Sequence, residues 1–170
     1  RGKDHLNNTF RQLYVYDAFD YDPPEFGHLP MISGLSKREG SPSVQAYRDE
    51  GYLPEAVVNY LARLGWSHGD QEMFTRDELV ELFELEDVNP GSGSFDEDKL
   101  RWFNSEWMKQ LPPEELAERW IPYLEAAGHE DVQPNERVQM IAEALHKRAE
   151  TLTEMAEKAG YFFTDDLERN

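Results

Sequence analysis

One short stretch of this sequence carries side chains that suit phosphate chemistry. Ser36, Lys37 and Arg38 follow one another in "LSKREG". A lysine on a flexible loop can reach phosphate oxygens as a point charge, and an arginine offers a planar fork for a phosphate or a neighbouring carboxylate. Taken alone the tripeptide is a weak signal, because a solvated loop is its commoner explanation. Its weight depends on the elements that would position it.

The sequence before this loop predicts one helix and one strand. Apolar residues recur at helical spacing from about residue 5 to 19, and Asp4 is placed to act as the N-cap of that helix. Pro23 and Pro24 end it. The following "EFGHLPMIS" is short, apolar and marked by proline, which is typical of a strand entering a sheet whose partners are elsewhere. That strand leads directly to the loop.

The sequence after the loop predicts a helix that begins at Pro54. Proline suits the first turn of a helix, and Gly65 is a natural stop at its far end. Val57, Leu61 and Leu64 recur at helical spacing. We expect these three residues to form the apolar stripe of this helix.

Local signals place the remaining elements. Thr75 and Glu78 have the spacing of a capping box, and Asp96 can cap the helix that follows it. Between them "NPGSGS", residues 89–94, indicates a loop. Further helices are expected over residues 113–127, 134–148 and 151–158. The sequence therefore predicts a mainly α protein.

The chain resembles the bacterial glutamyl-tRNA synthetases through three phrases in fixed order: "RGKDHLNNTFRQ" (1–12), "LSKREG" (35–40) and "GYLPEAVVNYLARLGWS" (51–67). The likeness continues through "FDEDKLRWFN" (95–104) and, more loosely, "GYFFTDDL" (160–167). In this family of class I ligases the nucleotide-binding fold begins upstream of the first phrase, with a histidine-rich ATP signature. We therefore interpret the chain as a fragment that lacks the N-terminal half of the catalytic domain.

The resemblance implies three regions. Residues 1–39 would be the C-terminal part of a class I nucleotide-binding fold of the Rossmann type, ending in the signature loop. Residues 40–110 would be the stem-contact domain, and residues 111–170 the start of the all-helical anticodon-binding domain. Between Gln110 and Pro113 the sequence changes from a mixed pattern to an all-helical one, which marks the second boundary.

The resemblance also implies roles for particular residues. Amino-acid activation joins the substrate carboxylate to the α-phosphate of ATP and releases pyrophosphate, a step that needs cations more than a base. ATP is a substrate and Mg²⁺ accompanies it, with no protein-bound metal expected in this segment. Arg1 matches the glutamate-binding arginine, Lys37 and Arg38 match the catalytic signature, and the ATP-binding positions are Gly2, Asp4, His5, Met31, Ile32, Ser36 and Lys37.

These roles suit the residue types. An arginine fork grips a carboxylate through two parallel hydrogen bonds, a glycine admits close approach of a nucleotide, and a helix start supplies backbone donors. Met31 and Ile32 match positions whose backbone faces the adenine. The alternative is a purely structural explanation, in which Asp4 is only a helix cap and His5 only an exposed helix residue.

Two features depart from the family pattern. Lys3 stands where the family has an acidic residue, which reverses a charge beside the nucleotide site. In addition, "MISG" runs straight into "LSKR", so that Gly34 occupies the place of a first signature lysine. Either the loop is shortened, or residues of a mobile loop are absent from this sequence. We favour the second explanation, in which Gly34 and Leu35 are not covalent neighbours.

Composition limits the class of protein. With 170 residues and 39% apolar content the chain can bury a core, and the absence of Cys excludes a disulfide framework or a thiolate zinc site. A chain without Cys fits a reducing compartment, and we expect a cytoplasmic protein. No apolar run approaches the length of a membrane span, so we expect no membrane partner.

The net charge of −18 argues against a nucleic-acid partner, because such surfaces usually carry an excess of Lys and Arg. The objection is limited, since a large acidic ligase can still present local cations. The candidate cations are Lys37, Arg38, Arg48, Lys99, Arg101, Lys109, Arg137, Lys147 and Arg148. For any one of them a solvated helix face is the commoner explanation.

Two function classes follow. The first is a glutamate–tRNA ligase fragment with tRNA, ATP and glutamate as partners, inactive alone, from a monomeric parent. The second is a non-catalytic or regulatory synthetase-like protein, which Lys3 and the short loop would suit. A truncated paralogue that glutamylates a tRNA base is disfavoured, because it lacks an anticodon-binding domain and helices are predicted here beyond Pro112. A glutaminyl enzyme is disfavoured because "RGKDHLNNT" follows the glutamyl pattern. An acidic helical interaction module is the remaining alternative.

Overall fold

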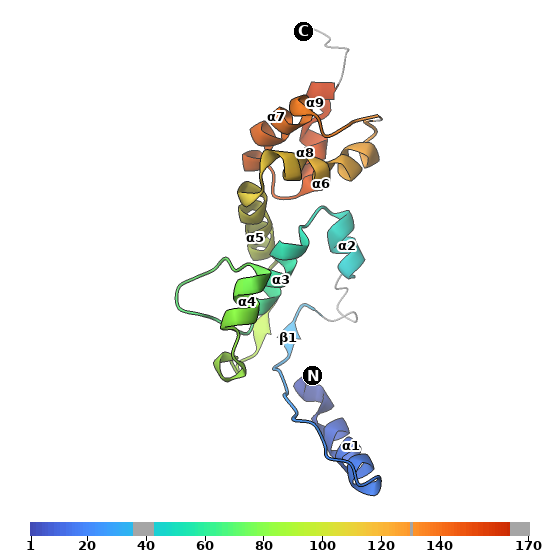
Figure 1. Ribbon diagram of the computed structural model, residues 1–170, viewed down its shortest axis with the longest axis vertical. Coiled ribbons are helices and arrows are strands. Elements are labelled where there is room, and N and C mark those ends of the chain that lie inside the picture. The colour runs from blue at the N-terminus through green and yellow to red at the C-terminus, as the bar shows by residue number, and fades with distance from the viewer. Residues whose placement is uncertain (36–42, 130, 164–170) are drawn as a thin grey trace.

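The computed structural model describes residues 1–35, 43–129 and 131–163. Figure 1 shows an elongated arrangement, with the first helix at one end, a short sheet next to it, and the last helices at the other end. The helices are α1 (Leu6–Ala18), α2 (Val44–Asp49), α3 (Pro54–Arg63), α4 (Arg76–Leu82), α5 (Glu97–Gln110), α6 (Pro113–Ala126), α7 (Glu136–Leu145), α8 (Leu152–Lys158) and α9 (Gly160–Phe163). The expected mainly α fold is confirmed.

The first helix begins differently from the prediction. Asp4 lies inside a 3₁₀ turn, η1 (Lys3–His5), and the N-cap of α1 is His5, which makes no side-chain capping hydrogen bond. The turn is closed by the backbone instead, because His5 N–H donates to the Gly2 carbonyl at 3.0 Å. The prediction that Asp4 caps the helix was therefore wrong.

After α1 the chain runs back along the helix (Figure 1). Thr9 is buried in α1, and its Oγ1 lies 2.8 Å from Nε2 of His28 on the returning segment. One residue further on, Leu29 forms a parallel bridge with Gly2. These contacts hold α1 and the returning segment together as one hairpin.

A two-stranded parallel sheet follows the hairpin. β1 (Ile32–Ser33) pairs with β2 (Gly93–Ser94), and Phe95 N–H extends the ladder by donating to the Ser33 carbonyl at 2.9 Å. The strand expected over residues 25–33 is confirmed only at its last two residues, Ile32 and Ser33. The expectation that residues 89–94 are entirely loop was wrong at its end, because pairing with a strand sixty residues away overrides the local glycine signal.

The face that α3 buries only partly matches the predicted stripe, of which Val57 and Leu64 are partly buried against the core. Its buried residues are Ala56, Asn59 and Tyr60, whereas Leu61 is 44% exposed. The actual face repeats at helical spacing from Leu53, the residue before Pro54. Prediction from apolar residues alone missed it, because a buried asparagine lies in the middle of this face.

The local capping predictions are confirmed. The Thr75 side chain accepts from Glu78 N–H while the Glu78 carboxylate accepts from Thr75 N–H, so both halves of the capping box are present. Asp96 accepts from Lys99 N–H at the start of α5. The short helix α2 was not expected, and Ser43 caps it by accepting from Ala46 N–H.

A continuous apolar core joins α3 and α5 to the last helices. Phe103 on α5 and Trp120 on α6 are fully buried in the same cluster, together with Met155 on α8. The predicted boundary at residue 110 falls between α5 and α6, and side chains on both sides share this cluster. The boundaries at residues 39 and 110 stay predictions.

Candidate functional site

The first candidate residues lie next to the segment that returns along α1, and Arg1 and Lys3 form backbone hydrogen bonds with it. Leu29 N–H donates to the Arg1 carbonyl at 2.8 Å, and Lys3 N–H donates to the Leu29 carbonyl at 2.9 Å. A Cβ on Gly2 would collide with Asp4 Oδ1 and lie 3.7 Å from Sδ of Met31. The structure therefore brings Gly2, Asp4 and Met31 together, and their binding of a nucleotide stays a prediction.

These residues form an open surface. Asp4, His5 and Met31 are exposed, and Gly2 is half-buried. His5 Nε2 lies 3.6 Å from Asp4 Oδ2, and its Nδ1 lies 3.1 Å from Asn8 Nδ2. Asp4 does not cap a helix, so the purely structural explanation given for it, a helix cap, is wrong.

The Arg1 guanidinium is held by a neighbour that the sequence did not single out. Arg1 Nη1 donates to Oε1 of Gln12, a residue of α1, at 2.7 Å. Gln12 is half-buried. The only sequence signal for it is that Gln12 closes the phrase "RGKDHLNNTFRQ", since the contact depends on the bridge between Gly2 and Leu29.

The strand β1 leads toward the signature loop. Ile32 lies in β1 and lines an apolar cavity with Leu61 and Trp66 of the region after the loop. The three predicted signature residues, Ser36, Lys37 and Arg38, lie outside the described residues. Their roles, and the interpretation of the loop before Leu35, stay predictions.

The structure sorts the candidate cations by their partners. Arg48, Lys99, Arg101 and Lys109 each lie within 3.5 Å of a carboxylate oxygen. Arg137 donates to the Phe162 carbonyl. Within the described segments, Lys147 and Arg148 are an adjacent pair of exposed cations without an ion pair.

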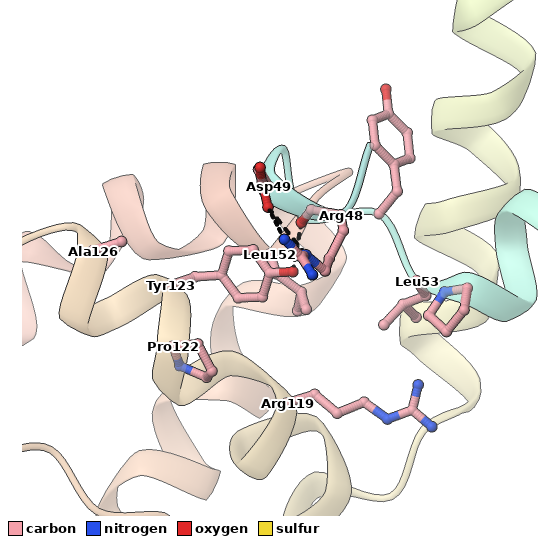
Figure 2. A pocket seen from close by; sticks show the side chains of 10 residues that line it. Arg48, Asp49, Leu53, Arg119, Pro122, Tyr123, Ala126 and Leu152 are labelled. Atoms are coloured by element: carbon pink, nitrogen blue, oxygen red, sulfur yellow. Dashed lines mark hydrogen bonds and ion pairs between the residues drawn. The ribbon is translucent and has the colours of Figure 1, made fainter. Parts of the chain in front are cut away.

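A pocket lies at the junction of the α2–α3 connection with α6 (Figure 2). Arg119 donates to both carboxylate oxygens of Glu55 at 3.0 Å, and Tyr123 Oη donates to the Arg48 carbonyl at 2.7 Å. Burial is the largest single influence on the pKa of Glu55 and works to raise it, but the hydrogen bonds from Arg119, a backbone hydrogen bond and the charge of Arg119 together leave the pKa below its usual range. Burial raises the pKa of Tyr123. The charges here satisfy one another, so the pocket is a structural junction.

Metal-binding clusters and membrane-spanning helices are both absent from residues 1–35, 43–129 and 131–163. Within these ranges no three His, Asp or Glu side chains converge as a metal ion would require. No helix in the same ranges is long and apolar enough to cross a membrane.

Family models match most of the chain. Residues 1–102 match the catalytic domain of the class I tRNA synthetases (E and Q), and residues 115–170 match an anticodon binding domain. The chain therefore belongs to the class I tRNA synthetases of the E and Q type.

Individual relatives carry the name glutamate–tRNA ligase. One from Anaeromyxobacter sp. (strain Fw109-5) is 52% identical over 168 residues, covering 96% of this chain and 36% of that protein. Another, from Geobacter sulfurreducens, is 47% identical, with 98% of this chain and 37% of that protein covered. The chain thus spans little more than a third of the length of these curated relatives.

The fold is similar to that of solved ligases. A glutamate tRNA ligase from Elizabethkingia meningosepticum, crystallised in complex with its amino acid, matches all of this chain and 38% of its own, with a TM-score of 0.80 and 28% identity. The glutamate-tRNA synthetase of Elizabethkingia anophelis matches with a TM-score of 0.79 at the same identity.

Proposed function

We propose that this chain is part of a cytoplasmic glutamate–tRNA ligase, which activates glutamate with ATP and transfers it to tRNA. The observation that carries the proposal is the 52% identity with a glutamate–tRNA ligase over 96% of the chain. The arrangement of Arg1, Gly2 and Met31 supports it, because residues far apart in sequence meet at one open surface.

Each part of the surface has a role in this proposal. The Arg1 fork grips a carboxylate of glutamate, which fixes the other carboxylate for attack on the α-phosphate. Lys37 and Arg38 offset the charge that builds on the phosphate oxygens as pyrophosphate leaves. ATP lies over Gly2, Asp4, His5, Met31, Ile32 and Ser36, and Mg²⁺ arrives with it.

The helical part of the chain would hold the tRNA. Residues 40–110 form the stem-contact domain in this proposal, and residues 111–170 begin the anticodon-binding domain. Lys147 and Arg148, exposed and without a carboxylate partner among the described residues, are the cations best placed to meet phosphate. We expect the parent enzyme to be a monomer.

Charging of tRNA tests the proposal. A full-length ligase that includes this chain is incubated with ATP, tRNA and labelled glutamate, and with labelled glutamine in a parallel reaction. We expect ATP-dependent label on tRNA with glutamate and about background with glutamine. Binding of tRNA without any charging would instead identify the non-catalytic synthetase-like protein, in which Lys3 and the short loop have removed the activity.

A further inference from the structure

We propose that Gln12 is a positioning residue for glutamate binding, which orients the Arg1 guanidinium while leaving its positive charge unpaired. The proposal rests on the proposed function, in which Arg1 grips a carboxylate of the substrate. It adds a residue on α1 that would set how well this grip works.

The backbone of Arg1 is anchored independently of its side chain. The Arg1 carbonyl accepts from Leu29 N–H, and the next residue, Gly2, pairs with Leu29 in the parallel bridge. The returning segment is itself fixed to α1 through Thr9 and His28. Only the long side chain of Arg1 remains to be ordered, and ordering such a side chain at the moment of binding has an entropic cost.

The hydrogen bond to Gln12 supplies that order. Arg1 Nη1 donates to Gln12 Oε1 at 2.7 Å, and Gln12 is half-buried on a helix of thirteen residues. Among the described residues Nε and Nη2 of Arg1 have no acceptor. One nitrogen is therefore used for positioning, and the edge formed by the other two stays available for a carboxylate.

The chemical type of the partner is the second argument. The other arginines that the structure shows in side-chain hydrogen bonds to side chains, Arg48, Arg63, Arg101 and Arg119, all donate to carboxylates. Arg1 alone among these described arginines donates to a neutral amide. In a chain with a net charge of −18, an oriented arginine without a carboxylate partner is suited to bind an anion from outside the chain.

Two substitutions separate positioning from simple packing. Gln12→Leu removes the acceptor. Gln12→Glu keeps the length and the acceptor but neutralises the Arg1 charge with a carboxylate. A purely structural role would tolerate Gln12→Glu, whereas a role in glutamate binding would not.

The experiment measures glutamate charging of tRNA by the full-length ligase. We expect Gln12→Leu to raise KM for glutamate by about tenfold or more, the change that loss of one hydrogen bond to a charged group produces. Gln12→Glu keeps the hydrogen bond, but its carboxylate competes with that of the substrate for Arg1, so we expect a rise in KM for glutamate of about the same size. KM for ATP and kcat should stay within about twofold of the wild-type values, since uniform binding is what is lost. In an Arg1→Ala background, Gln12→Glu should have no further effect on KM for glutamate.

Asn7→Asp is the matched control, because Asn7 is an exposed amide on the same helix without a described side-chain partner. It should leave KM for glutamate unchanged. A Gln12→Glu enzyme with wild-type KM for glutamate would overturn the inference and leave the ligase assignment intact. A wild-type enzyme that charges no glutamate would overturn both. If Gln12→Leu lowers the melting temperature of the enzyme, Gln12→Glu alone tests the proposal.

Discussion

The carbonyl oxygen of Gly51 accepts a hydrogen bond from the backbone N–H of Leu152 at 3.0 Å. This contact joins the segment before α3 to the first turn of α8, a hundred residues further along the chain. Gly51 has a φ of +86°, and a Cβ on it would lie 2.7 Å from Leu152 N and 2.5 Å from Thr153 N. Two backbones approach so closely here that only glycine fits.

We therefore expect Gly51→Ala to lower the free energy of unfolding by at least about 2 kcal/mol, from the positive φ and the overpacking together. Gly128→Ala is the control. Gly128 has a φ of +93°, but a Cβ added there would meet no atom within 4 Å, so only the cost of the left-handed backbone conformation, about 1 kcal/mol, applies. Urea unfolding of the two variants measures the difference, and equal losses would contradict the close approach.

Asn104 holds the same junction from inside. Its Oδ1 accepts from Leu53 N–H at 2.7 Å, and its Nδ2 donates to the Glu150 carbonyl at 2.6 Å. Asn104→Leu would leave the buried Leu53 N–H and the partly buried Glu150 carbonyl without this partner, so we expect a loss of about 2 to 4 kcal/mol in the free energy of unfolding. Asn7→Leu on the exposed face of α1 should change it by less than about 0.5 kcal/mol. Similar melting temperatures for the two variants would refute the buried network.

The pair of Glu55 and Arg119 predicts a dependence of stability on pH. The pKa of Glu55 is lower in the folded chain than in the unfolded chain, so the ionised carboxylate stabilises the fold at neutral pH. That stabilisation is lost as the pH falls through the folded-state pKa, from about pH 5 downward.

Melting temperatures between about pH 7 and 3 test this linkage. Arg119→Met should flatten the fall in melting temperature on the acidic side, because the hydrogen bonds and the charge of Arg119, which lower the pKa of Glu55, are gone. Arg76→Met, at an exposed arginine without an ion pair among the described residues, should keep the wild-type slope. An unchanged slope in Arg119→Met would assign the acid sensitivity to other carboxylates.

Prediction from sequence succeeded where the physics is local. The capping box of Thr75 and Glu78 and the cap at Asp96 depend on residues three apart, so their spacing is visible in the chain. The strand at Gly93 and the contact of Arg1 with Gln12 depend on partners brought together by the fold. The predicted cap at Asp4 failed for the same reason, since the bridge of Gly2 with Leu29 shapes that turn.

The chain alone should make no glutamyl-adenylate. The described candidate residues form an open surface, whereas catalysis of this step requires donors fixed around the reacting phosphate. ATP–pyrophosphate exchange with the purified 170-residue chain, glutamate and tRNA should therefore stay at background. Robust glutamate-dependent exchange would show that the fragment interpretation is wrong.

In the proposed function, Lys37 and Arg38 are the catalytic cations of a glutamate–tRNA ligase. Lys37→Ala in the full-length enzyme tests it most directly, with Lys109→Ala as the control for a lysine paired with Glu106. Loss of one contact made in the transition state costs on the order of 3 kcal/mol, so glutamate activation should slow by more than about a hundredfold while KM for glutamate stays unchanged. If the Lys37→Ala enzyme activates glutamate as fast as the Lys109→Ala enzyme does, Lys37 is not a catalytic cation and the proposed function of this loop is contradicted.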